Sequence, residues 1–84
     1  MSKITIKNEV FKIINEVTKK YGKKITDKNI DLKLYKSGTI DSLDYIKIIT
    51  DIETKLKIRI NIDQLDNNFS ANTLIKEIKK IIKN

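Results

Sequence analysis

Apolar positions recur at three- and four-residue spacing in three parts of the chain, and this pattern predicts three amphipathic helices. The first is expected over residues 5–20, the second over 42–56 and the third within 70–84. Each apolar stripe is expected to face the core. The stripes consist of Ile6, Val10, Ile13, Ile14 and Val17, then Tyr45, Ile48, Ile49, Ile52 and Leu56, and finally Leu74, Ile75, Ile78, Ile81 and Ile82.

The segments between these helices lack a sustained helical period. Residues 22–41 are expected to form a long loop held down by packing, and residues 57–63 alternate like a strand. Because a single strand would have no partner, we interpret 57–63 as a connector, with a short helical turn near 63–68. The apolar anchors are Ile25, Ile30, Leu32 and Leu34 in the loop and Ile58, Ile60 and Ile62 in the connector. The predicted fold is all-α: one domain over residues 1–84, a small four-helix bundle of three main helices plus one short helix.

Residues that favour helix ends mark the predicted boundaries. Thr5 is the predicted N-cap of the first helix, and Tyr21 with Gly22 follows a lysine pair at its end. For the last helix, Ser70 and Asn72 are the two candidates for the N-cap. Ser42 is the predicted N-cap of the second helix. Since position 45 is Tyr, we expect no reciprocal capping box there.

Two apolar residues lie on the outer half of the second helix. Leu43 and Ile46 project away from the core stripe, beside Lys47 and Thr50. Either loop residues cover them, or they form a partner-contact patch next to Ser42.

The composition excludes several kinds of chemistry. The chain of 84 residues has no cysteine and no histidine, which removes disulfides, zinc clusters, a thiol nucleophile and the usual acid–base residue. A domain of this size has a thin core and no deep cleft. No apolar run approaches the ~18 residues of a membrane span, and the N-terminus lacks the apolar run of a signal peptide. We therefore expect a non-catalytic, cytoplasmic, monomeric protein.

A serine at a helix start exposes its hydroxyl to solvent. Without a histidine to activate it, Ser42 is a poor catalytic nucleophile but a good acceptor for another enzyme. Both phosphorylation and attachment of a prosthetic arm remain open on these grounds.

The stretch "GTIDSLDYIKIITDIETKLKIRI" resembles the core of acyl carrier proteins, and the resemblance extends over residues 5–82. Asp41, Ser42 and Leu43 match the family's Asp-Ser-Leu at the start of the second helix. A glycine four residues before the serine, here Gly38, is similar to the loop of aryl-, peptidyl- and D-alanyl-type carriers. Further matches are Glu53, Leu56, Ile60 and Thr73.

The resemblance implies that Ser42 receives 4′-phosphopantetheine from coenzyme A through a Mg²⁺-dependent phosphopantetheinyl transferase. The thiol of this arm would carry an acyl or aminoacyl group as a thioester, between a loading ligase and an acyltransferase or synthase. Asp41 would help the transferase dock or hold its metal. The residues expected to contact partners are Asp41, Leu43, Asp44, Ile46, Lys47 and Thr50. The loop glycine favours an aminoacyl, D-alanyl or secondary-pathway cargo.

The formal net charge of +7 is unusual for this family. Residues 1–41 hold ten lysines and five acids, net +5, whereas 41–56 holds four acids and two lysines, net −2. We therefore expect a mildly acidic docking helix, in which Lys47 argues against standard fatty-acid-synthase partners. Two alternatives are an adaptor with the carrier fold but no prosthetic group, and a small basic nucleic-acid binder, which only the net charge supports.

Overall fold

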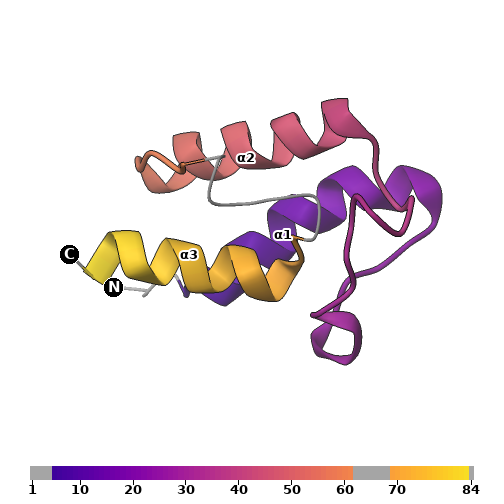
Figure 1. Cartoon of the computed structure of the whole chain (residues 1–84), viewed down its shortest axis with the longest axis horizontal. Helices are drawn as coiled ribbons and strands as arrows, with labels where there is room; N and C mark the ends of the chain where they lie inside the picture. The colour runs from indigo at the N-terminus through magenta and orange to yellow at the C-terminus, as the bar shows by residue number, and fades with distance from the viewer. Residues whose placement is uncertain (1–4, 62–68, 84) are drawn as a thin grey trace.

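Three α-helices and two short 3₁₀-helices make up the computed structural model, which describes residues 5–61 and 69–83 (Figure 1). No strand occurs in these two ranges, which confirms the predicted all-helical bundle. The short helical turn predicted near 63–68 lies outside the described residues. The elements are α1 (Ile6–Thr18), η1 (Lys19–Tyr21), η2 (Asp27–Asn29), α2 (Ser42–Leu56) and α3 (Ala71–Lys83).

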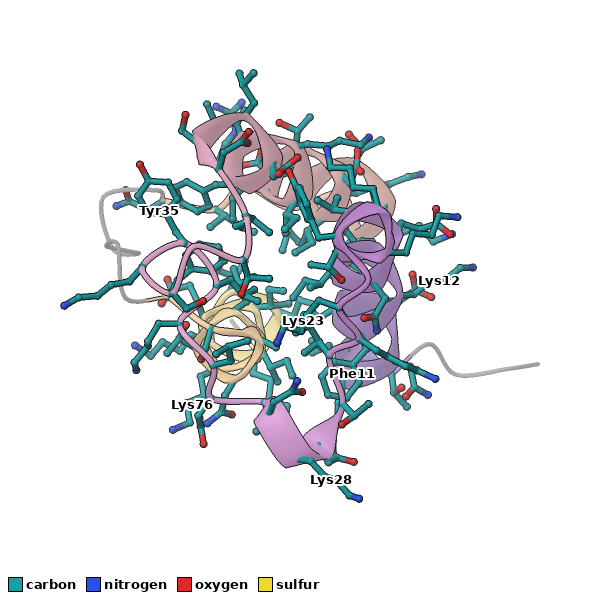
Figure 2. The ribbon with its side chains drawn as sticks, turned by 90° about the vertical axis from the view of Figure 1, so that its right-hand side faces the viewer. Phe11, Lys12, Lys23, Lys28, Tyr35 and Lys76 are labelled. Atoms are coloured by element: carbon teal, nitrogen blue, oxygen red, sulfur yellow. The ribbon has the colours of Figure 1, made fainter. Side chains whose placement is uncertain are left out.

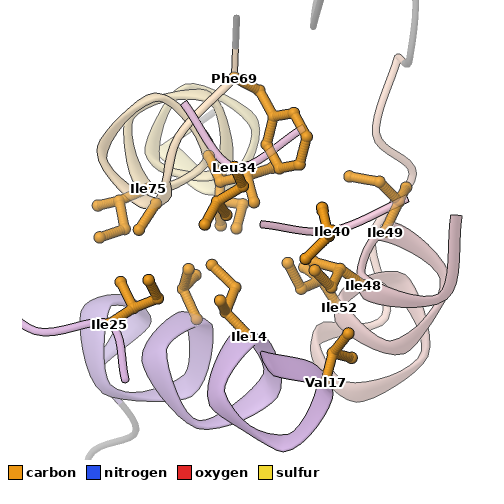
Figure 3. Packing of buried hydrophobic residues seen from close by; sticks show 14 of the residues in the cluster. Ile14, Val17, Ile25, Leu34, Ile40, Ile48, Ile49, Ile52, Phe69 and Ile75 are labelled. Carbon is orange, nitrogen blue, oxygen red and sulfur yellow. The ribbon is translucent and has the colours of Figure 1, made fainter. Parts of the chain in front are cut away.

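The central helix is α1, which contacts both α2 and α3. It runs in the opposite direction to the other two helices (Figure 1). Side chains from the intervening segments, Leu34, Ile40 and Phe69, lie between α3 and α2 (Figure 3). Tyr45 of α2 stacks on the Phe69 ring with 4.5 Å between centroids. The long loop and the residue Phe69, just before α3, are therefore part of the core.

The predicted apolar stripes form this core. The fully buried positions are Val10, Ile14 and Val17 of α1, Ile48, Ile49 and Ile52 of α2, and Leu74, Ile75 and Ile78 of α3. Ile82 is the exception: it is 48% exposed, because it lies in the last turn of α3 at the edge of the bundle. Its assignment to the core was wrong.

Side-chain hydrogen bonds begin α1 and α3 at predicted residues, and Gly22 ends η1 through its backbone. Thr5 caps α1 by accepting the Asn8 amide, and Gly22 follows η1 in the left-handed conformation with φ +71°. At α3, the Ser70 hydroxyl accepts the Thr73 amide at 3.2 Å, and Thr73 Oγ1 accepts the Ser70 amide at 2.7 Å. Ser70, rather than Asn72, therefore caps α3.

Ile25 and Leu34 of the long loop are buried, as predicted, and hydrogen bonds hold the loop near its start and near its middle. The Asn15 side chain bonds both backbone groups of Ile25, its Oδ1 accepting the amide at 2.7 Å and its Nδ2 donating to the carbonyl at 3.0 Å. Farther on, the Asn72 amide donates to the Ile30 carbonyl and its side chain donates to Asp31. The loop is thereby fastened to α1 and to the start of α3.

The connector after α2 folds back and contacts α2. Lys57 ends α2 in the left-handed conformation, and Ile60 is buried. The Ile60 amide donates to Glu53 Oε2 at 2.8 Å. This contact gives Glu53 a structural role and confirms that residues 57–61 form an anchored connector; Ile62 lies outside the described residues.

Candidate functional site

The first turn of α2 carries Ser42, and the cap of this helix is Asp41. Asp41 Oδ1 accepts the Asp44 amide at 2.9 Å, and Asp44 Oδ2 accepts the Asp41 amide at 3.3 Å. Ser42 is thus the first helical residue, and a reciprocal capping box is present. Both predictions about this cap were wrong. An aspartate caps as well as a serine, and counting from Asp41 puts an acid, not Tyr45, three residues on.

Because Asp41 caps α2, the Ser42 hydroxyl is available for another bond. The Ser42 side chain is exposed, and its hydroxyl makes no hydrogen bond to another described residue. It lies at a helix N-terminus, where the macrodipole favours an anion such as a phosphodiester. The chemistry of the position therefore fits a phosphate-linked group.

The backbone before Ser42 is fixed by a tight turn. The Ile40 amide donates to the Leu34 carbonyl at 3.1 Å, and the Leu34 amide donates to the Phe69 carbonyl at 3.2 Å. Gly38 closes the turn with φ +83°, a conformation that side chains disfavour. The buried Ile40 side chain then anchors the chain just before the cap. Gly38 therefore helps to set the path into the first turn of α2.

Asp44 is buried in this first turn, with only 4% of its surface exposed. Lys20 Nζ donates to its Oδ1 at 2.8 Å, and the Tyr21 hydroxyl donates to its Oδ2. Burial raises the pKa of the Asp44 carboxyl, but the hydrogen bonds from Lys20, Tyr21 and the Asp41 amide outweigh this effect and lower the pKa to about 2. The hydrogen bond to Asp44 in turn raises the pKa of both Lys20 and Tyr21.

This geometry corrects the role expected for Asp44. Its carboxylate faces inward and joins α2 to η1, so it does not belong to the exposed surface around Ser42. Lys20 and Tyr21 were predicted only to mark the end of a helix, and not to contact α2. No local pattern marks them, because their partner lies more than twenty residues away in the chain.

The outer side of α2 is an uncovered apolar surface. Leu43 is 76% exposed and Ile46 is 53% exposed, so the loop does not cover them. Lys47 and Thr50 are exposed beside them. The first of the two alternatives for these residues is therefore wrong.

This surface is less acidic than the net charge of residues 41–56 suggests, because most of its acids have partners within the described chain. Asp44 is buried against Lys20, and Asp51 pairs with Lys47 at 3.3 Å. Glu53 is engaged with the Ile60 amide. Of the four acids in this segment, Asp41 alone is both exposed and outside an ion pair with a described residue. Three of the four acids therefore have a partner within the described chain, and Asp41 is left exposed.

A shallow hollow on α1 lies apart from these residues. Its lining does not include Ser42, so the hydroxyl is not set in this hollow. The lining residues are Lys12, Asn15, Glu16, Lys19, Gly22, Lys23 and Lys24. The lysines of the described ranges spread over several elements, as Lys12, Lys28 and Lys76 illustrate in Figure 2. In these ranges they do not form the single basic face that nucleic-acid binding favours.

The described ranges contain neither a metal-binding cluster nor a membrane-spanning helix. No group of three carboxylates there is arranged to hold a metal ion. None of the helices described is both long and apolar enough to cross a membrane.

Curated proteins similar to this chain are D-alanyl carrier proteins. That of Bacillus mycoides (strain KBAB4) is 27% identical over 77 residues, covering 89% of this chain and 94% of the relative. Those of Bacillus cereus (strain B4264) and Bacillus anthracis (strain CDC 684 / NRRL 3495) match with the same identity and coverage. These relatives support a carrier-protein family for this chain. They also support a carrier function, with which the all-helical fold agrees. No protein-family model matches the carrier, and no solved structure matches it.

Proposed function

We propose that this carrier holds an acyl or aminoacyl group as a thioester on a 4′-phosphopantetheine arm attached to Ser42, and delivers it to partner enzymes of a specialised pathway. The observation that carries the proposal is the hydroxyl of Ser42. It is exposed at the start of α2 and makes no hydrogen bond to another described residue, because Asp41 performs the capping. The chain itself is not catalytic in this account.

Attachment of the arm requires a group transfer to Ser42. Ser42 Oγ forms a bond to the phosphorus that links pantetheine to the rest of coenzyme A. The pyrophosphate P–O bond breaks, adenosine 3′,5′-bisphosphate leaves, and the hydroxyl proton passes to a base of the transferase. Since the chain has no histidine, this base and the Mg²⁺ belong to the partner enzyme. The N-terminus of α2 then favours the negative charge of the phosphodiester.

The cargo we favour is an aminoacyl group such as D-alanyl. Two observations support this choice: the names of the curated relatives and the left-handed Gly38 four residues before the serine. The arm supplies the only thiol, because the chain has no cysteine. The partners are then a phosphopantetheinyl transferase, a loading ligase and an acyltransferase or synthase. In this proposal the carrier is a monomer and acts in the cytoplasm.

We propose that these partners contact Asp41, Leu43, Ile46, Lys47 and Thr50. The exposure of Leu43 and Ile46 supports an apolar contact. The charged side chains beside it are the exposed Asp41 and Lys47, of which Lys47 also pairs with Asp51. Partners of this carrier are therefore expected to present an apolar patch with a carboxylate near Lys47. Asp41 is the acid available to help the transferase dock or hold its metal.

Intact-mass spectrometry tests the attachment. The full chain is incubated with coenzyme A, Mg²⁺ and a broad-specificity phosphopantetheinyl transferase, beside Ser42→Ala and Ser37→Ala. Ser37 is a matched control because it is also an exposed serine on the same approach. We expect one arm on the wild type and on Ser37→Ala, and none on Ser42→Ala. An unmodified wild type would favour the adaptor, and salt-dependent binding of a DNA or RNA duplex would favour the nucleic-acid binder.

A further inference from the structure

The buried carboxylate of Asp44 connects η1 to the N-terminal end of α2. Lys20 and Tyr21 of η1 each donate a hydrogen bond to it, one to each oxygen. Asp44 Oδ2 also accepts the backbone amide of Asp41. The end of α1, through η1, is thus joined to the first turn of α2, and Figure 1 shows these two helix ends side by side.

The same carboxylate controls the backbone on both sides of Ser42. It bonds the amide of Asp41, immediately before Ser42, and it belongs to Asp44, two residues after it. A buried carboxylate is costly unless its hydrogen bonds are made. Removal of Lys20 or Tyr21 would therefore oblige Asp44 to turn toward water, and the turn that contains Ser42 would have to move with it.

We propose that Lys20 and Tyr21 are positioning residues for Ser42: by holding Asp44, they fix the orientation in which the hydroxyl meets the transferase. This inference rests on the proposed attachment at Ser42. Neither residue needs to touch the arm or the transferase, since both act through Asp44.

The competing explanation is that this cluster only stabilises the fold. The Lys7–Asp27 pair offers a matched comparison, since it is also a lysine–aspartate contact that joins α1 to the following segment, at 2.5 Å. It is exposed on both sides and involves no residue of α2. A stabilising contact of this kind has no reason to alter the turnover of the transferase on folded protein.

The test measures arm transfer by a broad-specificity phosphopantetheinyl transferase on the full chain with coenzyme A. The variants are Lys20→Met, Tyr21→Phe and the double variant, with Lys7→Met as the control. Far-UV circular dichroism identifies a temperature at which the wild type and all variants are folded. We expect kcat to fall about tenfold in the double variant with KM little changed, because misplacing a reacting group slows the chemical step. Lys20→Arg, which keeps a donor to Asp44, should restore most of the rate.

A double-mutant cycle shows whether the effect passes through Asp44. In an Asp44→Asn background, Lys20→Met should cause no further loss of kcat. An additive loss would mean that Lys20 meets the transferase directly, and would overturn the inference.

Failure of the inference differs from failure of the proposed function. If the wild type is loaded and the double variant keeps wild-type kcat, the positioning role is wrong and the attachment stands. If the wild type accepts no arm, the attachment is wrong and the positioning role falls with it.

Discussion

Asp41 and Asp44 each accept the backbone amide of the other, at 2.9 and 3.3 Å, and Ser42 stands between them without taking part. The cap and the proposed attachment point are therefore two different residues. This separation allows the hydroxyl of Ser42 to be removed without loss of the side chain that caps α2.

Substitutions at the cap should separate these two roles. Asp41→Ala is expected to lower the free energy of unfolding by about 1 kcal/mol because it removes the capping side chain. Ser42→Ala is expected to change it by less than about 0.5 kcal/mol, as exposed substitutions do. Urea unfolding followed by circular dichroism measures both values. A loss in Ser42→Ala as large as that in Asp41→Ala would restore Ser42 as the cap.

Acid should weaken the domain through Asp44. Its folded pKa of about 2 lies below the ordinary value of 3.8, so its ionised form stabilises the fold fully above pH 3.8. That contribution, about 2 kcal/mol, is lost as the pH falls from 3.8 toward 2. The measurement is urea unfolding between pH 6 and 2 for the wild type and Asp44→Asn. The stability difference between them should shrink over this interval; a constant difference would contradict the structure around Asp44.

Gly38 should matter for loading as well as stability. Gly38→Ala puts a side chain at φ +83°, which is expected to cost about 1 kcal/mol. Gly22→Ala is the matched control, because its φ of +71° is also left-handed and neither glycine has an atom within 4 Å of the added Cβ. Both variants should lose similar stability in urea. Only Gly38→Ala should also lower the rate of arm transfer to Ser42; equal rates in the two variants would show that the turn does not position Ser42.

Lys47 should select partners by charge. Lys47→Glu is expected to slow loading by the ligase that acts on the wild-type chain, with the largest effect at low salt. The loading rate of Lys47→Met should lie between those of the wild type and Lys47→Glu. The pair with Asp51 contributes only about 0.3–0.5 kcal/mol, so stability should hardly change. Thioester formation followed by mass spectrometry from low to high salt provides the measurement. Faster loading of Lys47→Glu would mean that the partners recognise an acidic carrier.

The helices were predictable because hydrophobic periodicity is local. The bounds of α2 agree with the prediction, and its buried positions Ile48, Ile49 and Ile52 follow directly from the spacing. The same spacing predicted that Leu43 and Ile46 lie on the outer side of α2. It could not show whether a loop covers them.

The errors arose where a neighbour in space decides the outcome. Adjacent aspartate and serine are both good caps, so the sequence alone could not choose between Asp41 and Ser42. Asp44 looked like a surface acid because its partners, Lys20 and Tyr21, come from another helix end. The number of acids in residues 41–56 was a poor guide to the charge of the surface for the same reason. A count cannot show which carboxylates turn inward.

The most direct test of the carrier account is the intact mass of the protein purified from its own cells, before and after treatment with neutral hydroxylamine, which cleaves thioesters. The account predicts a chain that is heavier by one 4′-phosphopantetheine plus an acyl or aminoacyl group. Hydroxylamine should remove the acyl group and leave the arm on the peptide that contains Ser42. A chain that has its unmodified mass in growing cells, or an arm on a residue other than Ser42, would contradict the account.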